Sequence, residues 1–80
     1  MTKYNVKVIF NEKEHTKRTP DIKGAILSLK PEIVYTESYF IISPVGSKEL
    51  TERHLNLANT KKLFRDEQYL DIFINNLLLT

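Results

Sequence analysis

Alternating apolar and polar residues near the amino end of the chain predict a strand over residues 3–10. Alternation of this kind, with β-branched and aromatic side chains at the apolar positions, is typical of a strand that buries one face. We expect its core face to carry Tyr4, Val6, Val8 and Phe10. The segment that follows, residues 11–18, is polar throughout and is predicted to form a solvated loop.

A helix is predicted next, because apolar residues between Pro20 and Pro31 recur three or four positions apart. Thr19 can cap this helix, and Pro20 suits its first position. Pro31 should end it, since proline disfavours helical geometry in the residue before it. The predicted buried stripe consists of Ile22, Ala25, Ile26 and Leu29.

A second extended segment is predicted over residues 32–43, and turn residues with the sequence PVGSKE follow it. Phe40 and Ile42 should point from this strand into the core. Tyr39 and Ile41 alternate with them and should therefore lie on the opposite face.

Residues 50–57 fit either a helix or a strand. In a helix, Leu50, His54 and Leu57 would lie on one side. In a strand, Leu55 and Leu57 would point into the core instead. We favour the strand, because a hairpin with the preceding extended segment gives both strands a partner.

The carboxyl end, residues 59–80, has the apolar spacing of two successive helices. Asn59 or Thr60 can cap the first helix, and Asp66 can cap the second. The second helix should bury a stripe that consists of Leu70, Phe73, Ile74 and Leu77.

Together these elements predict an α+β fold over residues 1–80 with the order β-α-β-β-α-α. We expect one small domain, in which a three-stranded, mainly antiparallel sheet has the helices packed on one face. A chain of 80 residues has room for a single core. Because it contains no cysteine, its stability must come from core packing or from association with another chain rather than from disulfides.

Composition suggests where the protein works. Its hydrophobic fraction of 41% and charged fraction of 28% are ordinary for a globular protein. No apolar run approaches the roughly 20 residues that cross a bilayer, and the amino end lacks the features of a signal peptide. We therefore expect a cytoplasmic protein, and its richness in Lys, Asn and Ile is typical of an AT-rich bacterial or phage genome.

Motifs for catalysis are missing from the sequence. Two glycines cannot form a glycine-rich phosphate loop, and no serine lies in a nucleophile-elbow motif. His15 is predicted to be solvated in the polar loop, and His54 to be a surface residue beside Glu52. Neither has the spacing of a metal site. We expect no enzyme activity, no cofactor, no metal and no small-molecule substrate.

The sheet face opposite the helices should combine basic and aromatic side chains, which can bind phosphates and stack on bases. With the neighbouring loop, this set consists of Lys3, Lys7, Lys17, Arg18 and Tyr39. Ile9 and Ile41 on the same face favour a packing surface instead, and the net charge of +2 is modest. Nucleic-acid binding is therefore our alternative hypothesis.

The last helix has more apolar residues than one buried stripe requires. The surplus consists of Tyr69, Ile72, Leu78 and Leu79. These side chains can pack within the domain, or they can contact another chain. Residues 66–80 contain three acids and no base, whereas a helix on a membrane surface carries Lys and Arg, so a membrane is disfavoured.

Our first hypothesis is a non-catalytic protein-binding module that acts as an adaptor, an assembly factor or an inhibitor. Its partner would be another protein or a second copy of the chain. The surplus residues of the last helix would make the contact, and Tyr39 and Ile41 would form a second contact surface.

Overall fold

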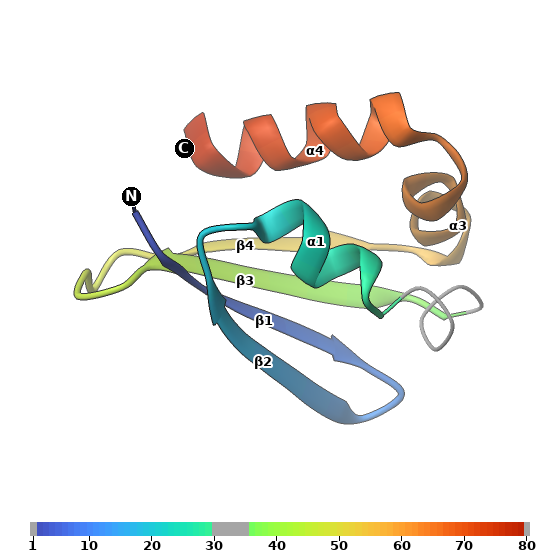
Figure 1. Ribbon diagram of the computed structural model, residues 1–80. Coiled ribbons are helices and arrows are strands. Elements are labelled where there is room, and N and C mark those ends of the chain that lie inside the picture. The colour runs from blue at the N-terminus through green and yellow to red at the C-terminus, as the bar shows by residue number, and fades with distance from the viewer. Residues whose placement is uncertain (1, 30–35, 80) are drawn as a thin grey trace.

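The computed structural model describes residues 2–29 and 36–79, except for the side chain of Leu79. It is an α+β structure with an antiparallel sheet, as the sequence predicted (Figure 1). The elements, in chain order, are β1 (Tyr4–Phe10), β2 (Lys13–Thr19), α1 (Ile22–Leu27), β3 (Ser38–Pro44), β4 (Thr51–Leu55), α3 (Leu57–Arg65) and α4 (Glu67–Leu79).

The sheet has four strands in the order β2-β1-β3-β4, so the prediction of three strands was wrong. The polar residues predicted as a loop form β2, which pairs with β1 from Phe10↔Lys13 onward. The two residues between them, Asn11 and Glu12, have φ values of 52° and 62°, the backbone of a tight hairpin turn. An edge strand largely exposed to solvent needs no apolar face, and for this reason β2 gave no hydrophobic signal.

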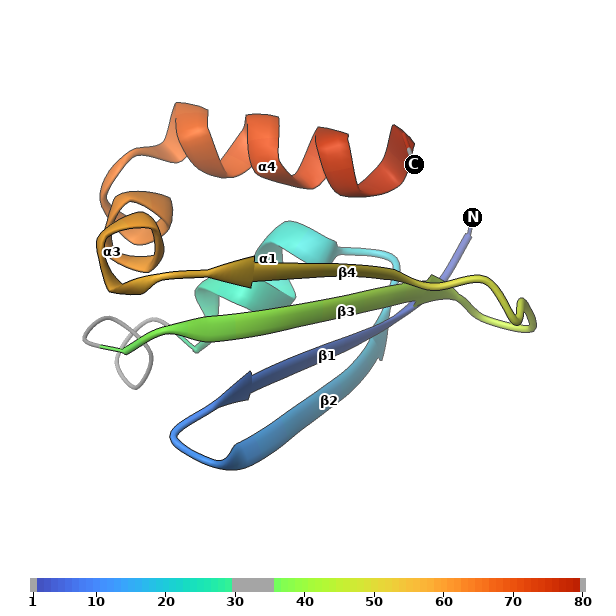
Figure 2. The same cartoon turned by 180° about the vertical axis from the view of Figure 1, so that it is seen from behind.

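The helices lie on one face of the sheet, as the two opposite views show (Figures 1 and 2). The side chains predicted to point inward from β1 and β3 are buried, except that Tyr4 is half-buried at the edge of the core. The predicted stripe of α4 is buried as well. Phe73 of this stripe meets the ring of Phe40 edge-on, with 5.2 Å between the ring centroids.

Helix α1 begins later than predicted, at Ile22. Its cap is Asp21, whose Oδ1 accepts a hydrogen bond of 2.9 Å from the Gly24 N–H. Thr19, the predicted cap, accepts a bond from the Asp21 N–H instead. A Cβ at Gly24 would overlap the Asp21 carboxylate, so the glycine is needed for this close cap. Pro31, the predicted end of the helix, lies outside the described residues.

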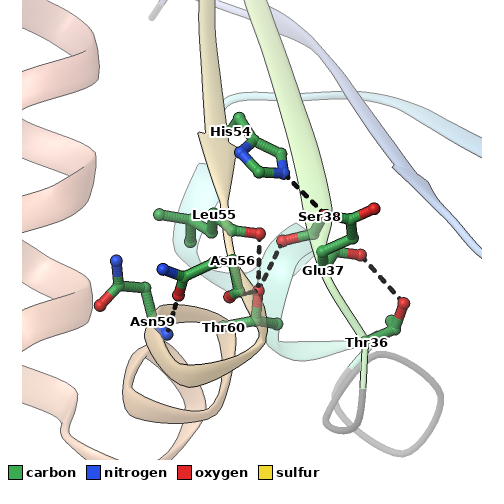
Figure 3. A network of polar contacts seen from close by, with 8 residues as sticks. All are labelled: Thr36, Glu37, Ser38, His54, Leu55, Asn56, Asn59 and Thr60. Atoms are coloured by element: carbon green, nitrogen blue, oxygen red, sulfur yellow. Dashed lines mark hydrogen bonds and ion pairs between the residues drawn. The ribbon is translucent and has the colours of Figure 1, made fainter.

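The predicted strand in residues 50–57 is confirmed as β4, but Leu57 belongs to α3. The cap of α3 is Asn56, whose Oδ1 accepts a bond of 2.8 Å from the Asn59 N–H, so the predicted caps were wrong. Thr60 is instead fully buried, and its hydroxyl bonds to the Ser38 hydroxyl at 3.0 Å (Figure 3). Asp66 caps α4 as predicted, since its Oδ1 accepts a bond from the Gln68 N–H at 3.0 Å.

An ion pair joins the helices α1 and α4. Lys23 Nζ lies 2.6 Å from Glu67 Oε1 and 3.0 Å from Asp71 Oδ1. The hydrogen bond to Glu67, followed by the one to Asp71, raises the pKa of Lys23 above its ordinary value of 10.5. The contact fixes the acidic flank of α4 against α1.

Candidate functional site

An open cleft of about 510 Å³ lies at one end of the molecule. The carboxyl-terminal end of α4, the start of β1 and the β3–β4 hairpin come together there (Figures 1 and 2). We call this cleft the α4–hairpin groove. Its lining residues are Tyr4, Ile42, Pro44, Glu49, Leu50, Thr51, Glu52, Arg53, Leu77 and Leu78.

The α4–hairpin groove has an apolar floor and an apolar rim. Ile42 and Leu77 are buried and belong to the core, so they form the floor. The rim includes Leu50 from the hairpin, which is 57% exposed, and Leu78 from α4, which is 44% exposed. Two large exposed leucines beside a cleft of the core can be buried together by one inserted side chain.

The α4–hairpin groove also reaches the edge of the sheet. Three consecutive residues of β4, Thr51 to Arg53, line it. β4 is the last strand in the sheet order, so the groove extends from β1 and β3 to the edge of the sheet. At this edge the Arg53 guanidinium donates a hydrogen bond of 2.7 Å to the carbonyl oxygen of Glu52.

The predicted contact residues of α4 have different environments. Leu78 lines the groove, whereas Ile72 is 51% exposed but lies outside the groove. Tyr69 is half-buried against the core, and Lys62 Nζ lies 4.8 Å from the centroid of its ring. Tyr69 is thus largely used within the domain. The side chain of Leu79 lies outside the described residues.

Sequence reasoning did not find the other half of the groove. The pattern around Leu50 predicts only its place in a strand or a helix, and the pattern around Tyr4 predicts only its place in the core. These two residues and Leu78 are far apart along the chain, and the fold brings them to one cleft. No pattern in the sequence joins residues with such separations.

The sheet face opposite the helices carries the second predicted contact surface. Tyr39 is 49% exposed and its ring lies 4.6 Å from that of His54, at an angle of 42°. His54 Nε2 also lies 3.1 Å from Glu37 Oε2 (Figure 3). Ile41 is half-buried on the same face. Tyr39 is therefore accessible to a partner, but its ring already packs against His54 of the neighbouring strand β4.

The predicted nucleic-acid-binding residues are divided between the two faces of the sheet. Lys17 is paired with Val6 and lies on the helix-covered side. Lys7 and Arg18 lie on the other side with Tyr39, in register positions opposite Thr16 and Asn5. Lys3 precedes β1, and its carbonyl accepts a hydrogen bond from the Val45 N–H.

Carboxylates accompany the cations on the open face of the sheet. Glu14 is paired with Ile9 of β1, and Glu52 is paired with Ile41 of β3. With Glu37 beside His54, this face carries acids as well as the bases of Lys7 and Arg18. The electrostatic attraction for a phosphate backbone is weaker than a purely basic face would give.

The prediction that His15 is solvated in a polar loop was also wrong. This residue lies on β2, half-buried, and its ring stacks on Phe10 with 4.7 Å between centroids and an angle of 6°. It lines a second, smaller cleft of about 400 Å³ between β2 and α1, which has Val6, Val8 and Ala25 among its lining residues.

Two further properties concern the described part of the chain. No group of three or more His, Asp or Glu side chains in residues 2–29 and 36–79 is placed to hold a metal ion. Within the same residues, no helix combines the length and the hydropathy needed to span a bilayer.

We compared the chain with protein-family models, with curated proteins and with solved structures, and none of them gave a significant match.

Proposed function

We propose that this chain is a small, non-catalytic protein-binding module that works by occupying part of a partner's surface. The α4–hairpin groove is the binding site. The proposal depends on one observation: Leu50 and Leu78 are both about half exposed on the rim of a cleft whose floor belongs to the core. An adaptor, an assembly factor or an inhibitor would all use such a site.

The energy available supports a modest but specific contact. Complete burial of a leucine side chain stabilises a complex by about 1.5–3 kcal/mol, and about half of each rim leucine is already covered. Each should therefore contribute about 1 kcal/mol of binding free energy. Because association itself costs several kcal/mol, the partner must add further contacts along the groove.

Nucleic-acid binding has less support than protein binding. The cations expected to act together lie on two sides of the sheet, and Glu14 and Glu52 share the open face with Lys7 and Arg18. A protein that held nucleic acid would need a more continuous basic surface. It remains the alternative, and nuclease treatment of the sample tests it.

The test is affinity capture from an extract of the source cells, with and without nuclease. Two variants form a matched pair, Leu78→Gln inside the groove and Ile72→Gln outside it, both on α4 and both neutral. We expect capture of a discrete protein by wild type and by Ile72→Gln, with a strong reduction for Leu78→Gln. Circular dichroism should show that both variants fold.

Three results would contradict the proposal. Capture that is insensitive to Leu78→Gln would exclude the groove, and loss of capture on nuclease treatment would favour nucleic acid. Equal loss in both variants would point to the outer side of α4 instead. Sedimentation analysis of the purified chain gives the remaining alternative, since a dimer that Leu78→Gln dissociates would identify a second copy as the partner.

A further inference from the structure

We infer that the occupant of the α4–hairpin groove is an extended segment of a different protein, which adds to the edge of β4 as a fifth strand. It inserts one large apolar side chain between Leu50 and Leu78 and carries Lys or Arg beside it. This inference rests on the proposed function, because it names the class of partner for the same site.

The course of the groove favours an extended occupant over a helix. Thr51, Glu52 and Arg53 are consecutive and all line it, so an occupant of the groove has three residues of the edge strand β4 within reach. β4 is the last strand of the sheet order, and a polypeptide that lies along such an edge can continue the hydrogen-bond ladder. A helix has no free backbone donors to offer that edge, since its own turns use them.

The backbone of β4 already takes part in a bond of the kind that a partner would supply. The Glu52 carbonyl accepts a hydrogen bond from the Arg53 side chain at 2.7 Å. An incoming backbone N–H can replace this flexible guanidinium as the donor. The exchange leaves both groups satisfied, because Arg53 is only partly buried and its guanidinium can return to water.

The side-chain pocket explains the apolar anchor. In an extended segment every second side chain points to the same face, so one of them faces the helix side of the sheet. There it meets the floor made by Ile42 and Leu77, with Leu50 and Leu78 on the rim. A large apolar side chain such as Leu, Met or Phe can cover both rim leucines at once.

Charge favours Lys or Arg next to this anchor. Two acidic residues, Glu49 and Glu52, and one basic residue, Arg53, line the groove. The Glu52 side chain lies on the open face of β4, the face to which the residues next to the anchor in an added strand would point. Bases on the incoming segment are therefore attracted and acids repelled, which sets both the encounter rate and the choice of partner.

The same argument disfavours a second copy as the occupant. The other edge strand of the sheet, β2, has the required bases in its sequence KEHTKRT but no large apolar side chain to act as the anchor. β4 itself, with the sequence TERHL, offers no exposed anchor either, since its single leucine, Leu55, is buried in the core. A different protein provides both features at once.

The experiment uses the full chain and a phage-displayed library of random dodecapeptides. We expect the enriched peptides to share a large apolar residue with Lys or Arg within two positions. Synthetic peptides from this set should bind at least tenfold more weakly to Leu78→Gln, and within twofold of wild type to Ile72→Gln. Their amide shift changes in NMR spectra should be centred on β4 and the end of α4.

Backbone methylation tests the strand itself. A strand offers N–H groups to one neighbour from every second residue. Peptides N-methylated at odd positions and at even positions should therefore differ, with one series losing binding at least tenfold and the other retaining it. Equal binding of both series, or shift changes centred on the open sheet face, would overturn the inference.

The outcomes separate the inference from the proposed function. If cellular capture depends on Leu78 but the library gives no peptides, or gives peptides with acidic flanks, the site stands and the extended basic occupant is wrong. If cellular capture does not depend on Leu78, the proposed function fails, and the inference that rests on it fails with it.

Discussion

The buried hydroxyl pair of Ser38 and Thr60 gives a prediction whose size follows from the geometry. Both side chains are fully buried, at the start of β3 and in the first turns of α3. Their oxygens lie 3.0 Å apart, and Thr60 Oγ1 also donates to the Asn56 carbonyl at 2.9 Å (Figure 3). Either hydroxyl can donate between the two at this distance, and we assign Ser38 as the donor, because the single Thr60 proton is used by the nearer Asn56 carbonyl.

This direction makes the two single substitutions unequal. Thr60→Val keeps the shape of the side chain but leaves the Ser38 hydroxyl buried with no acceptor, which costs about 1–3 kcal/mol. Ser38→Ala leaves Thr60 still bonded to the Asn56 carbonyl, so only one ordinary hydrogen bond is lost, about 0.5–1.5 kcal/mol. The double variant Ser38→Ala with Thr60→Val leaves neither hydroxyl unsatisfied. Its loss of stability should be smaller than the sum of the two single losses.

Urea unfolding followed by circular dichroism at 222 nm measures all four proteins of this cycle. A domain of this size has a free energy of unfolding of about 4–12 kcal/mol, so differences of about 1 kcal/mol are resolved. If Ser38→Ala costs as much as Thr60→Val, the assigned donor is wrong. If the double variant costs the full sum, the two hydroxyls are not coupled.

Three further substitutions test separate parts of the fold by the same unfolding assay. Lys23→Met should lower the free energy of unfolding at neutral pH, because pairing with Glu67 raises the pKa of Lys23 in the folded protein above 10.5. The difference in stability from wild type should persist below pH 10.5 and shrink as the pH rises through the pKa of folded Lys23. A difference that stays unchanged at high pH would refute this. Glu12→Gly should raise the free energy of unfolding by about 1 kcal/mol, since φ is 62° at this residue, and no gain would mean that the turn holds no strain. Asp66→Ala should lower it by about 1 kcal/mol, because the α4 N–H groups lose their cap, and a neutral result would show that water replaces the carboxylate.

The sequence predicted those parts of the fold that have an apolar face. The stripe of α4 and the inward positions of β1 and β3 were found because burial imposes a period of about 3.6 or 2 residues. The strand β2 was missed because it lies at an edge and is mostly exposed. The only residue that indicated a turn before β2 was Asn11, a residue type that tolerates positive φ. Glu12 beside it is a residue type that rarely has positive φ and so argued against a turn.

Capping residues were predicted less well than helices, for a local reason. Thr19, Asp21, Asn56, Asn59 and Thr60 all have side chains that can cap. The backbone path into each helix decides which of them does so, and that path depends on the preceding strand. Thr60, which lies one turn inside α3, is instead used by the core through Ser38.

An exposed apolar residue indicates a binding site only when its surroundings are concave. Ile72 and Leu78 lie on the same helix and are 51% and 44% exposed. Apolar atoms make up more than half of most protein surfaces, so exposure does not distinguish them. Leu78 lines the same cleft as Leu50 and the buried residues Ile42 and Leu77, whereas Ile72 does not line it. A partner's side chain can lose water on several sides beside Leu78 but on only one beside Ile72, and this difference should make the two glutamine variants behave differently.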